Sequence, residues 1–169
     1  DFDSEKSLTL YASVSGSINM NNVYLSDNSC LDVSTSSSGS IDMDDAFAGT
    51  FKATSSSSGN IDINNLTADT ATIRCSSSGE FETEMKVNAL TASSSSNGNM
   101  SLSGIVGNAS LTASSNGEID AEDLTAKRVS ISESRRTGGK IIGFGKADSD
   151  DDDDELNEVK ARNVKLEMP

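Results

Sequence analysis

The sequence predicts an all-β fold: a right-handed single-stranded parallel β-helix of about seven rungs, each 19–23 residues long. The first observation is a glycine, usually preceded by Ser, that recurs at spacings of 23, 20, 20, 19, 19 and 22 residues from Gly16 to Gly139. The second is that apolar residues keep a fixed register to that glycine. The third is composition: with only 34% hydrophobic and 4% aromatic residues, the chain suits a narrow tube filled by mid-sized side chains. We therefore expect one β-helix domain over residues 1–169.

The strand before each glycine is expected to form the first wall of the tube. Residues eight and six positions before the glycine are apolar, as in Leu31 and Val33, and period-two alternation turns them inward. Residues four and two positions before it are smaller, as in Thr35 and Ser37, and we expect both to face inward with their hydroxyls bonded from rung to rung. The glycine itself is expected to turn the first corner with a positive φ.

The strand after each glycine is expected to form the second wall. Its inward residues should stack in one buried column, which includes Ile41, Ile61, Phe81 and Met100. Polar dipeptides such as Asp44-Asp45 and Asn64-Asn65 then suit a second corner, because Asn and Asp tolerate turn geometry. A third wall should bury Val23, Ala46, Leu66, Val87, Ile105 and Leu124. Three short strands per period complete the predicted helix.

The last rung departs from this pattern. Glu133 occupies a position that is inward in earlier rungs. Residues 146–158 then interrupt the rung, and we interpret them as an acidic loop insertion between the second and third walls. After it, the apolar pattern of residues 159–166 matches that of residues 124–131. We expect residues 164–168 to form a closing strand over the open edge.

The charge and the missing residue types exclude several functions. The net charge is −14, from 13 basic and 27 acidic residues, which argues against binding nucleic acid or an anionic membrane surface. No apolar run of 18 residues exists to span a membrane. The absence of His removes Ser-His and Cys-His nucleophiles and His metal ligands.

The two cysteines are not expected to form a disulfide. Cys30 and Cys75 should lie about 10 Å apart, two rungs away from each other, which is too far for a disulfide bond. Cys75 should be buried.

The outward face of the second wall carries the candidate site. Asp42, Asp62 and Glu82 each stand three residues after a glycine, and Asp120 shares their column. In a parallel in-register stack such neighbours lie ~4.8 Å apart, and their repulsion is about 1 kcal/mol per pair at a surface. Ca²⁺ or a cationic partner would relieve that repulsion, since carboxylate oxygens suit Ca²⁺. The alternative is a solvated acidic face that keeps a β-rich protein soluble and discourages sideways pairing.

A recurring Ser-Gly-x-Ile-x-apolar motif carries a family resemblance. It stands at residues 38–43 and 58–63, and a Leu-x-Ala step follows the second copy at residues 66–68. Over roughly residues 7 to 133 the chain resembles the head GIN domain of putative autotransporter adhesins, a family found largely in Bacteroidetes. The resemblance implies a right-handed β-helix in a secreted or surface-attached bacterial protein with an adhesin role. It implies no catalytic or binding residue.

These observations together predict a non-enzymatic module of the cell surface or outside the cell, associated with the outer membrane. It would be an adhesin-like binding or spacer domain whose partner is a glycan or a surface protein, with no cofactor unless Ca²⁺ binds. The alternative is a polysaccharide-active, pectinase-like β-helix enzyme that uses Asp42, Asp62 and Glu82 as acid and base. That alternative is weak, because the chain offers few aromatic platforms for sugars and fold alone does not establish function.

Overall fold

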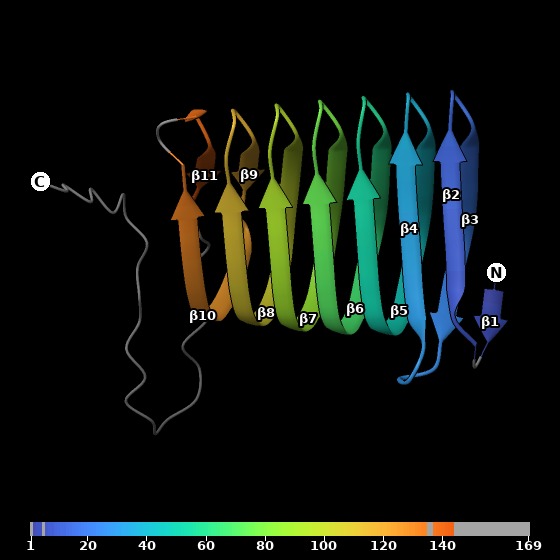
Figure 1. Ribbon diagram of the computed structural model, residues 1–169. Coiled ribbons are helices and arrows are strands. Elements are labelled where there is room, and N and C mark those ends of the chain that lie inside the picture. The colour runs from blue at the N-terminus through green and yellow to red at the C-terminus, as the bar shows by residue number, and fades with distance from the viewer. Residues whose placement is uncertain (1, 5, 135–136, 144–169) are drawn as a thin grey trace, which may run out of the picture.

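The computed structural model describes residues 2–4, 6–134 and 137–143. In this part the chain winds round a narrow tube as a parallel β-helix, and successive turns lie side by side along its axis (Figure 1). The strands are β1 (Phe2–Ser4), β2 (Leu8–Ser13), β3 (Ser17–Leu25), β4 (Cys30–Ser36), β5 (Ser40–Ser55), β6 (Asn60–Cys75), β7 (Glu80–Ser94), β8 (Asn99–Ala113), β9 (Glu118–Asp120), β10 (Leu124–Glu133) and β11 (Lys140–Ile142). The predicted fold is confirmed.

The long strands β5 to β8 each run through more than one wall. Each begins just after a corner glycine and continues through the third wall into the first wall of the next rung. In the first turns, β3 ends at Leu25 and β4 begins at Cys30, because a turn over residues 26–29 separates them. This turn absorbs the longer spacing of 23 residues between the first two glycines.

The register confirms the buried column of the second wall. Ile41 pairs with Ile61, Ile61 with Phe81, and Phe81 with Met100, so each residue lies directly beside its equivalent in the next rung. The exposed fraction of these side chains does not exceed 2%. The tube therefore excludes water with a continuous stack of mid-sized side chains.

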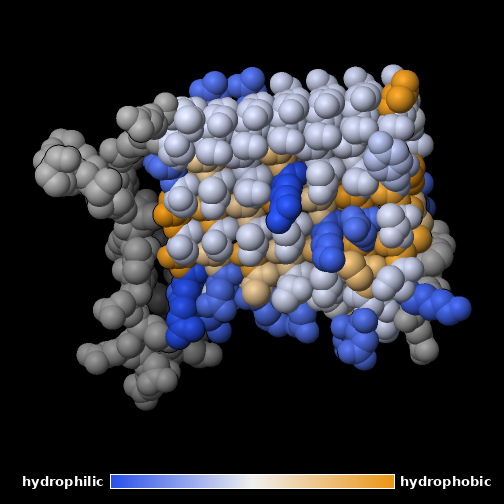
Figure 2. All heavy atoms as spheres, in the orientation of Figure 1, coloured by the Kyte–Doolittle hydropathy of each residue, from blue (hydrophilic) through white to orange (hydrophobic). Residues whose placement is uncertain are grey.

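The first wall follows the predicted alternation. Leu31, Val33 and their equivalents as far as Ala109 and Leu111 are buried, and the outward positions between them hold mainly Ser and Thr. In the last rung the equivalent residues are less buried, since Val129 is half-buried and Ile131 is 39% exposed. This wall faces the viewer in Figures 1 and 2, and its pale colour in the space-filling view reflects those residues of intermediate hydropathy.

Buried hydroxyls at the narrow end of the first wall are hydrogen-bonded, once from rung to rung as predicted and otherwise to the corner glycine of their own rung. Thr35 Oγ1 donates to Ser55 Oγ at 3.1 Å, and Ser55 Oγ donates to the carbonyl oxygen of Gly59 at 2.6 Å. Ser94 donates in the same way to the carbonyl oxygen of Gly98. Within the described residues no buried side-chain nitrogen or oxygen lacks a partner, so the polar corner is compatible with burial.

The first corner differs from the prediction in two respects. The residue two positions before the glycine, represented by Ser57, does not face inward but is exposed at the tip of the turn. Ser57 and Ser58 have φ values of 51° and 66°, whereas the positive φ predicted for Gly59 is absent. The Gly59 N–H donates to the Ser56 carbonyl, which gives a four-residue turn with both central residues left-handed. Alternation therefore stops at Ser55.

The corner glycines are required by close approach instead of by φ. A Cβ on Gly59 would lie 2.5 Å from Thr35 Oγ1 and 3.0 Å from the Thr35 carbonyl carbon in the preceding rung. Equivalent contacts with the preceding rung recur from Gly39 to Gly139. The repeating glycine is thus the residue that lets consecutive turns stack at the first corner.

The third wall contains a second correction. Leu66 pairs with Met85 and Met85 with Gly104, so the fourth and fifth rungs are one residue shorter at the second corner. Val87 is buried but lies one inward position further along, beside Ala68. The prediction that Ile105 is buried was wrong: its side chain is 61% exposed. A fixed distance from the glycine cannot follow a one-residue deletion.

The remaining predictions concern the cysteines and the end of the chain. Cys75 is buried and both cysteines are free thiols, as predicted. The described residues contain no helix long and apolar enough to cross a membrane. The predicted acidic insertion over residues 146–158 and the predicted closing strand over residues 164–168 lie outside the described residues.

Candidate ligand-binding wall

The second wall brings three of the four predicted site residues together. Asp42 pairs with Asp62, and Asp62 pairs with Glu82, so their Cα atoms are direct neighbours across adjacent strands. Ser101 follows in the same column and separates Glu82 from Asp120. The acidic ladder (Asp42, Asp62 and Glu82) is therefore continuous, and Asp120 stands apart from it by one rung.

The position of these carboxylates follows from the local sequence. Each residue three positions after the glycine lies between two inward residues, as Asp62 lies between Ile61 and Ile63, which are fully buried. Burial of both neighbours fixes the backbone and directs the carboxylate outward. Asp42 and Asp62 are half-buried at the wall surface, and Glu82 is exposed.

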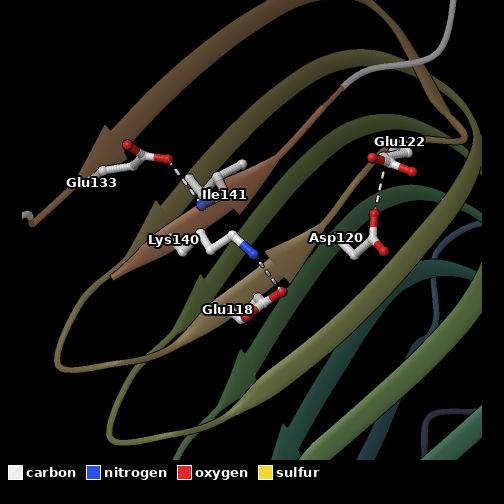
Figure 3. Close-up of polar contacts among 6 residues, drawn as sticks. All are labelled: Glu118, Asp120, Glu122, Glu133, Lys140 and Ile141. Atoms are coloured by element: carbon white, nitrogen blue, oxygen red, sulfur yellow. Dashed lines mark hydrogen bonds and ion pairs between the residues drawn. The ribbon is translucent and has the colours of Figure 1, made fainter. Parts of the chain in front are cut away.

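Local hydrogen bonds hold two members of the column. Ser40 Oγ donates to Asp42 Oδ2 at 3.0 Å. The backbone N–H of Glu122 donates to Asp120 Oδ1 at 3.1 Å, as Figure 3 shows. Asp62 accepts no hydrogen bond from other described residues. It is the member of the acidic ladder whose oxygens are least committed, and it has an acidic neighbour on each side.

In the neighbouring column an ammonium group lies beside a carboxylate of the adjacent rung. Lys140 in β11 pairs with Glu118 in β9, and Lys140 Nζ lies 3.2 Å from Glu118 Oε1 (Figure 3). Both side chains are exposed, so the pair itself contributes little stability. It does show that a positive group one rung away reaches an outward carboxylate of the second wall.

The second corner uses amides for the same purpose. Asn64 Nδ2 donates to Asp44 Oδ1 at 3.1 Å, and Asn65 Nδ2 donates to Asp45 Oδ1 at 2.9 Å. Both aspartates of this corner in the second rung therefore have a donor directly beside them in the third. The acidic ladder has no such donors between its members, which distinguishes it from the corner.

A shallow hollow of about 230 Å³ lies where the acidic ladder meets the second corner. It is lined by Asn19, Met20, Asn21, Asp42, Met43, Asp44, Asp62 and Asn64. The sequence pattern predicted only a turn for the Asn and Asp residues of this corner. Their register, five residues after the glycine, is the signal that places them beside the acidic ladder on the same side of the tube.

The side chains of the described residues do not form a complete metal-binding site. Among the described residues no group of three or more His, Cys, Asp or Glu side chains is gathered closely enough to hold a metal ion. Carboxylates one rung apart can still share a ligand pairwise, because their ~4.8 Å spacing is within reach of two oxygens bound to one cation. A cation held between two of these carboxylates would need further oxygens from water or from the partner.

Comparison with known proteins identifies the family. The family model described as "Putative auto-transporter adhesin, head GIN domain" matches residues 3–84 and again residues 53–142. The two overlapping matches are what a repeating fold produces, and together they cover most of the chain. No curated protein and no solved structure matches. The chain belongs to the auto-transporter adhesin head GIN domain family.

Proposed function

We propose that this protein is a non-enzymatic binding head, located at the cell surface or outside the cell and associated with the outer membrane. The family description supports an adhesin-type role, and the β-helix supplies a long rigid wall on which ligand contacts can repeat from rung to rung. The partner is a glycan or a surface protein that approaches the second wall through a positive group or through a bridging Ca²⁺.

One observation carries this proposal: the unrelieved stacking of Asp42, Asp62 and Glu82 beside a polar hollow. Elsewhere on the same side of the tube, Asp44, Asp45 and Glu118 each have an amide or an ammonium group beside them in the adjacent rung. Like charges directly opposite on neighbouring strands are unfavourable. A ligand that brings a positive charge to the acidic ladder would relieve this repulsion, and the relief would favour binding.

The first experiment tests the role of the cation. Calorimetric titration and thermal melting with CaCl₂ are carried out on the wild type, on Asp62→Asn and on Asp32→Asn. Asp32 is a matched control, because it is an outward, half-buried aspartate on the first wall. We expect Ca²⁺ to raise the melting temperature of the wild type and of Asp32→Asn but not of Asp62→Asn. Absence of heat and of any shift in the wild type would remove Ca²⁺ from the proposal.

The second experiment tests binding and the enzymatic alternative together. A glycan array is probed with and without Ca²⁺, using the wild type and Asp62→Asn. Binding that the substitution abolishes supports the second wall as the ligand surface. In parallel, polyuronates are incubated with the wild type, and new reducing ends or unsaturated products are measured. Product formation that disappears in Asp62→Asn would replace the binding role with an enzymatic one.

A further inference from the structure

The third wall carries two aromatic side chains beside each other on its outer surface. Tyr24 in β3 pairs directly with Phe47 in β5, and each stands between two buried residues of its strand and therefore points outward. Tyr24 is 44% exposed, Phe47 is half-buried, and neither ring belongs to the buried core. The next rung has an exposed Thr67 in the same column, so this wall does not require an aromatic residue there. We call Tyr24 and Phe47 the aromatic step.

Polar side chains lie along one side of the aromatic step. Asn22 and Asp45 stand two residues before Tyr24 and Phe47, so they share the outer surface about 6.6 Å away along each strand. Asp45 is held in place, because Asn65 Nδ2 donates to its Oδ1 atom at 2.9 Å. A carboxylate has several acceptor positions, so Asp45 can also accept a hydrogen bond from a ligand at the aromatic step.

The turn over residues 26–29 bounds the other side. Gly49 stands two residues after Phe47, and a Cβ atom on Gly49 would overlap the carbonyl oxygen of Asp27 in this turn. The turn therefore packs directly against the third wall, and Figure 1 shows it projecting near the lower end of β4. The side chains of Asp27 and Asn28 are exposed on it. The aromatic step thus has polar groups on both sides along the strands.

The size and the charge of this surface indicate what it can bind. A stable protein interface covers about 800 Å² per partner, whereas even a complete aromatic side chain contributes only about 150–250 Å², and these two are partly buried. A sugar ring fits better, because its C–H face is apolar and its hydroxyl groups need polar partners at the edge. Asp27 and Asp45 flank the aromatic step and the net charge is −14, so uronic sugars would be repelled.

We propose that the aromatic step binds a glycan made of neutral or amino sugars. One sugar ring stacks on Tyr24 and Phe47, and Asp45 accepts hydrogen bonds from its hydroxyl or ammonium groups. This inference rests on the proposed function in one respect, that the ligand is a glycan. It adds a contact on the third wall, across the second corner from the acidic ladder.

Oligosaccharide binding by the full chain tests the proposal. An array of neutral, amino and uronic oligosaccharides is probed with the wild type, Tyr24→Thr, Phe47→Thr and Tyr11→Ser. Thr suits the position, because Thr67 occupies this column in the next rung. Tyr11→Ser is the matched control, since it removes the other exposed tyrosine, on the first wall, where Ser34 follows in its column. We expect neutral or amino sugars to bind the wild type and the control, and each Thr variant to lose about tenfold or more in affinity, as interface aromatics typically do.

The tyrosine ring itself gives a second readout. Tyr11→Ser leaves Tyr24 as the single tyrosine of the chain, so its ring protons are the only tyrosine signals in an NMR spectrum of this variant. We expect titration with the oligosaccharide that binds best on the array to shift these signals, because the sugar lies against the ring. Saturable binding without such a shift overturns the stacking.

The other outcomes separate this inference from the role of the second wall. Glycan binding that Asp62→Asn abolishes and neither Thr variant weakens overturns the aromatic step and supports the acidic ladder as the glycan site. The opposite pattern supports the aromatic step alone. Absence of binding to every glycan overturns this inference, whereas the Ca²⁺ titration still tests the acidic ladder. If a Thr variant melts at a lower temperature, Tyr24→Leu, which keeps an apolar side chain without a ring, gives the same comparison.

Discussion

Gly59 lies directly against Thr35 of the preceding rung, and the space between them does not admit a Cβ atom. Since Thr35 Oγ1 also donates to Ser55, it cannot move away without breaking the buried hydroxyl chain. We expect Gly59→Ala to lower the free energy of unfolding by about 1–3 kcal/mol, as overpacking of a rigid site does. Urea denaturation measures it. Ser58→Ala changes the exposed neighbour as a control, and an equal loss in both variants would contradict the close-approach explanation.

Val14 is the residue least suited to its backbone conformation. It has a φ of 51° at the first corner of the first rung, where later rungs place Ser, and its side chain is 78% exposed. A left-handed conformation costs a β-branched residue roughly 1–2 kcal/mol, whereas Asn tolerates it. Val14→Asn should therefore raise the midpoint of urea denaturation, and Val14→Ile should not. A lower midpoint for Val14→Asn would show that the isopropyl group makes a contact more valuable than the strain it carries.

The fold could be predicted because two patterns indicate the same structure. The spacing of the glycines and the alternation of apolar residues both indicate stacked turns around one buried interior. Ile41, Ile61 and Phe81 share one position relative to the glycine, and inward facing is the only way to bury all of them. The acidic ladder followed from the same register, since outward positions are fixed once inward ones are known. Both predictions needed only counting along the chain.

The corners could not be obtained by counting. The left-handed φ values of Ser57 and Ser58 are supplied by ordinary residues, although positive φ is usually assigned to glycine. The exposure of Ile105 depends on a one-residue deletion at the preceding corner, which alternation cannot locate without the partner strand. The hollow beside Asp62 depends on where the chain bends at the second corner, and residue spacing alone does not give that position.

The amide that faces Asp45 is expected to matter more than its exposed position suggests. Asn65 Nδ2 donates to Asp45 Oδ1 at 2.9 Å, so Asn65→Asp replaces a hydrogen bond with two carboxylates on adjacent rungs. We expect a loss of about 1 kcal/mol in the free energy of unfolding at low ionic strength, measured by urea denaturation. Asp45→Asn in the same background should restore only part of it, because Glu84 lies beside position 65 on the other side. Failure of the double variant to recover would place the effect elsewhere.

The acidic ladder should itself lower stability when no ligand is bound. Asp62 has Asp42 on one side and Glu82 on the other, and Asp62→Asn removes both repulsions while it keeps the shape of the side chain. We expect a rise of up to about 1 kcal/mol in the free energy of unfolding at 10 mM salt, declining toward zero at 1 M salt because screening weakens the repulsion between exposed charges. Thermal melting across this salt range measures the effect. A rise that does not depend on salt would contradict its electrostatic origin.

Cys75 should make the fold sensitive to alkaline pH. Burial, and to a smaller extent the negative charge of Glu80, raises the pKa of the Cys75 thiol from 9.0 to about 12. Unfolded chains therefore lose this proton above pH 9 while the native protein keeps it until about pH 12. The contribution is fully present below pH 9 and is lost as pH rises toward 12, at up to about 1.4 kcal/mol per pH unit. Cys75→Ser, which matches Ser55 and Ser94 in the adjacent rungs, should remove this slope, and Cys30→Ser should keep it. Urea denaturation between pH 8 and pH 11 compares the three proteins, and parallel pH profiles for the wild type and Cys75→Ser would rule out the thiol as the cause.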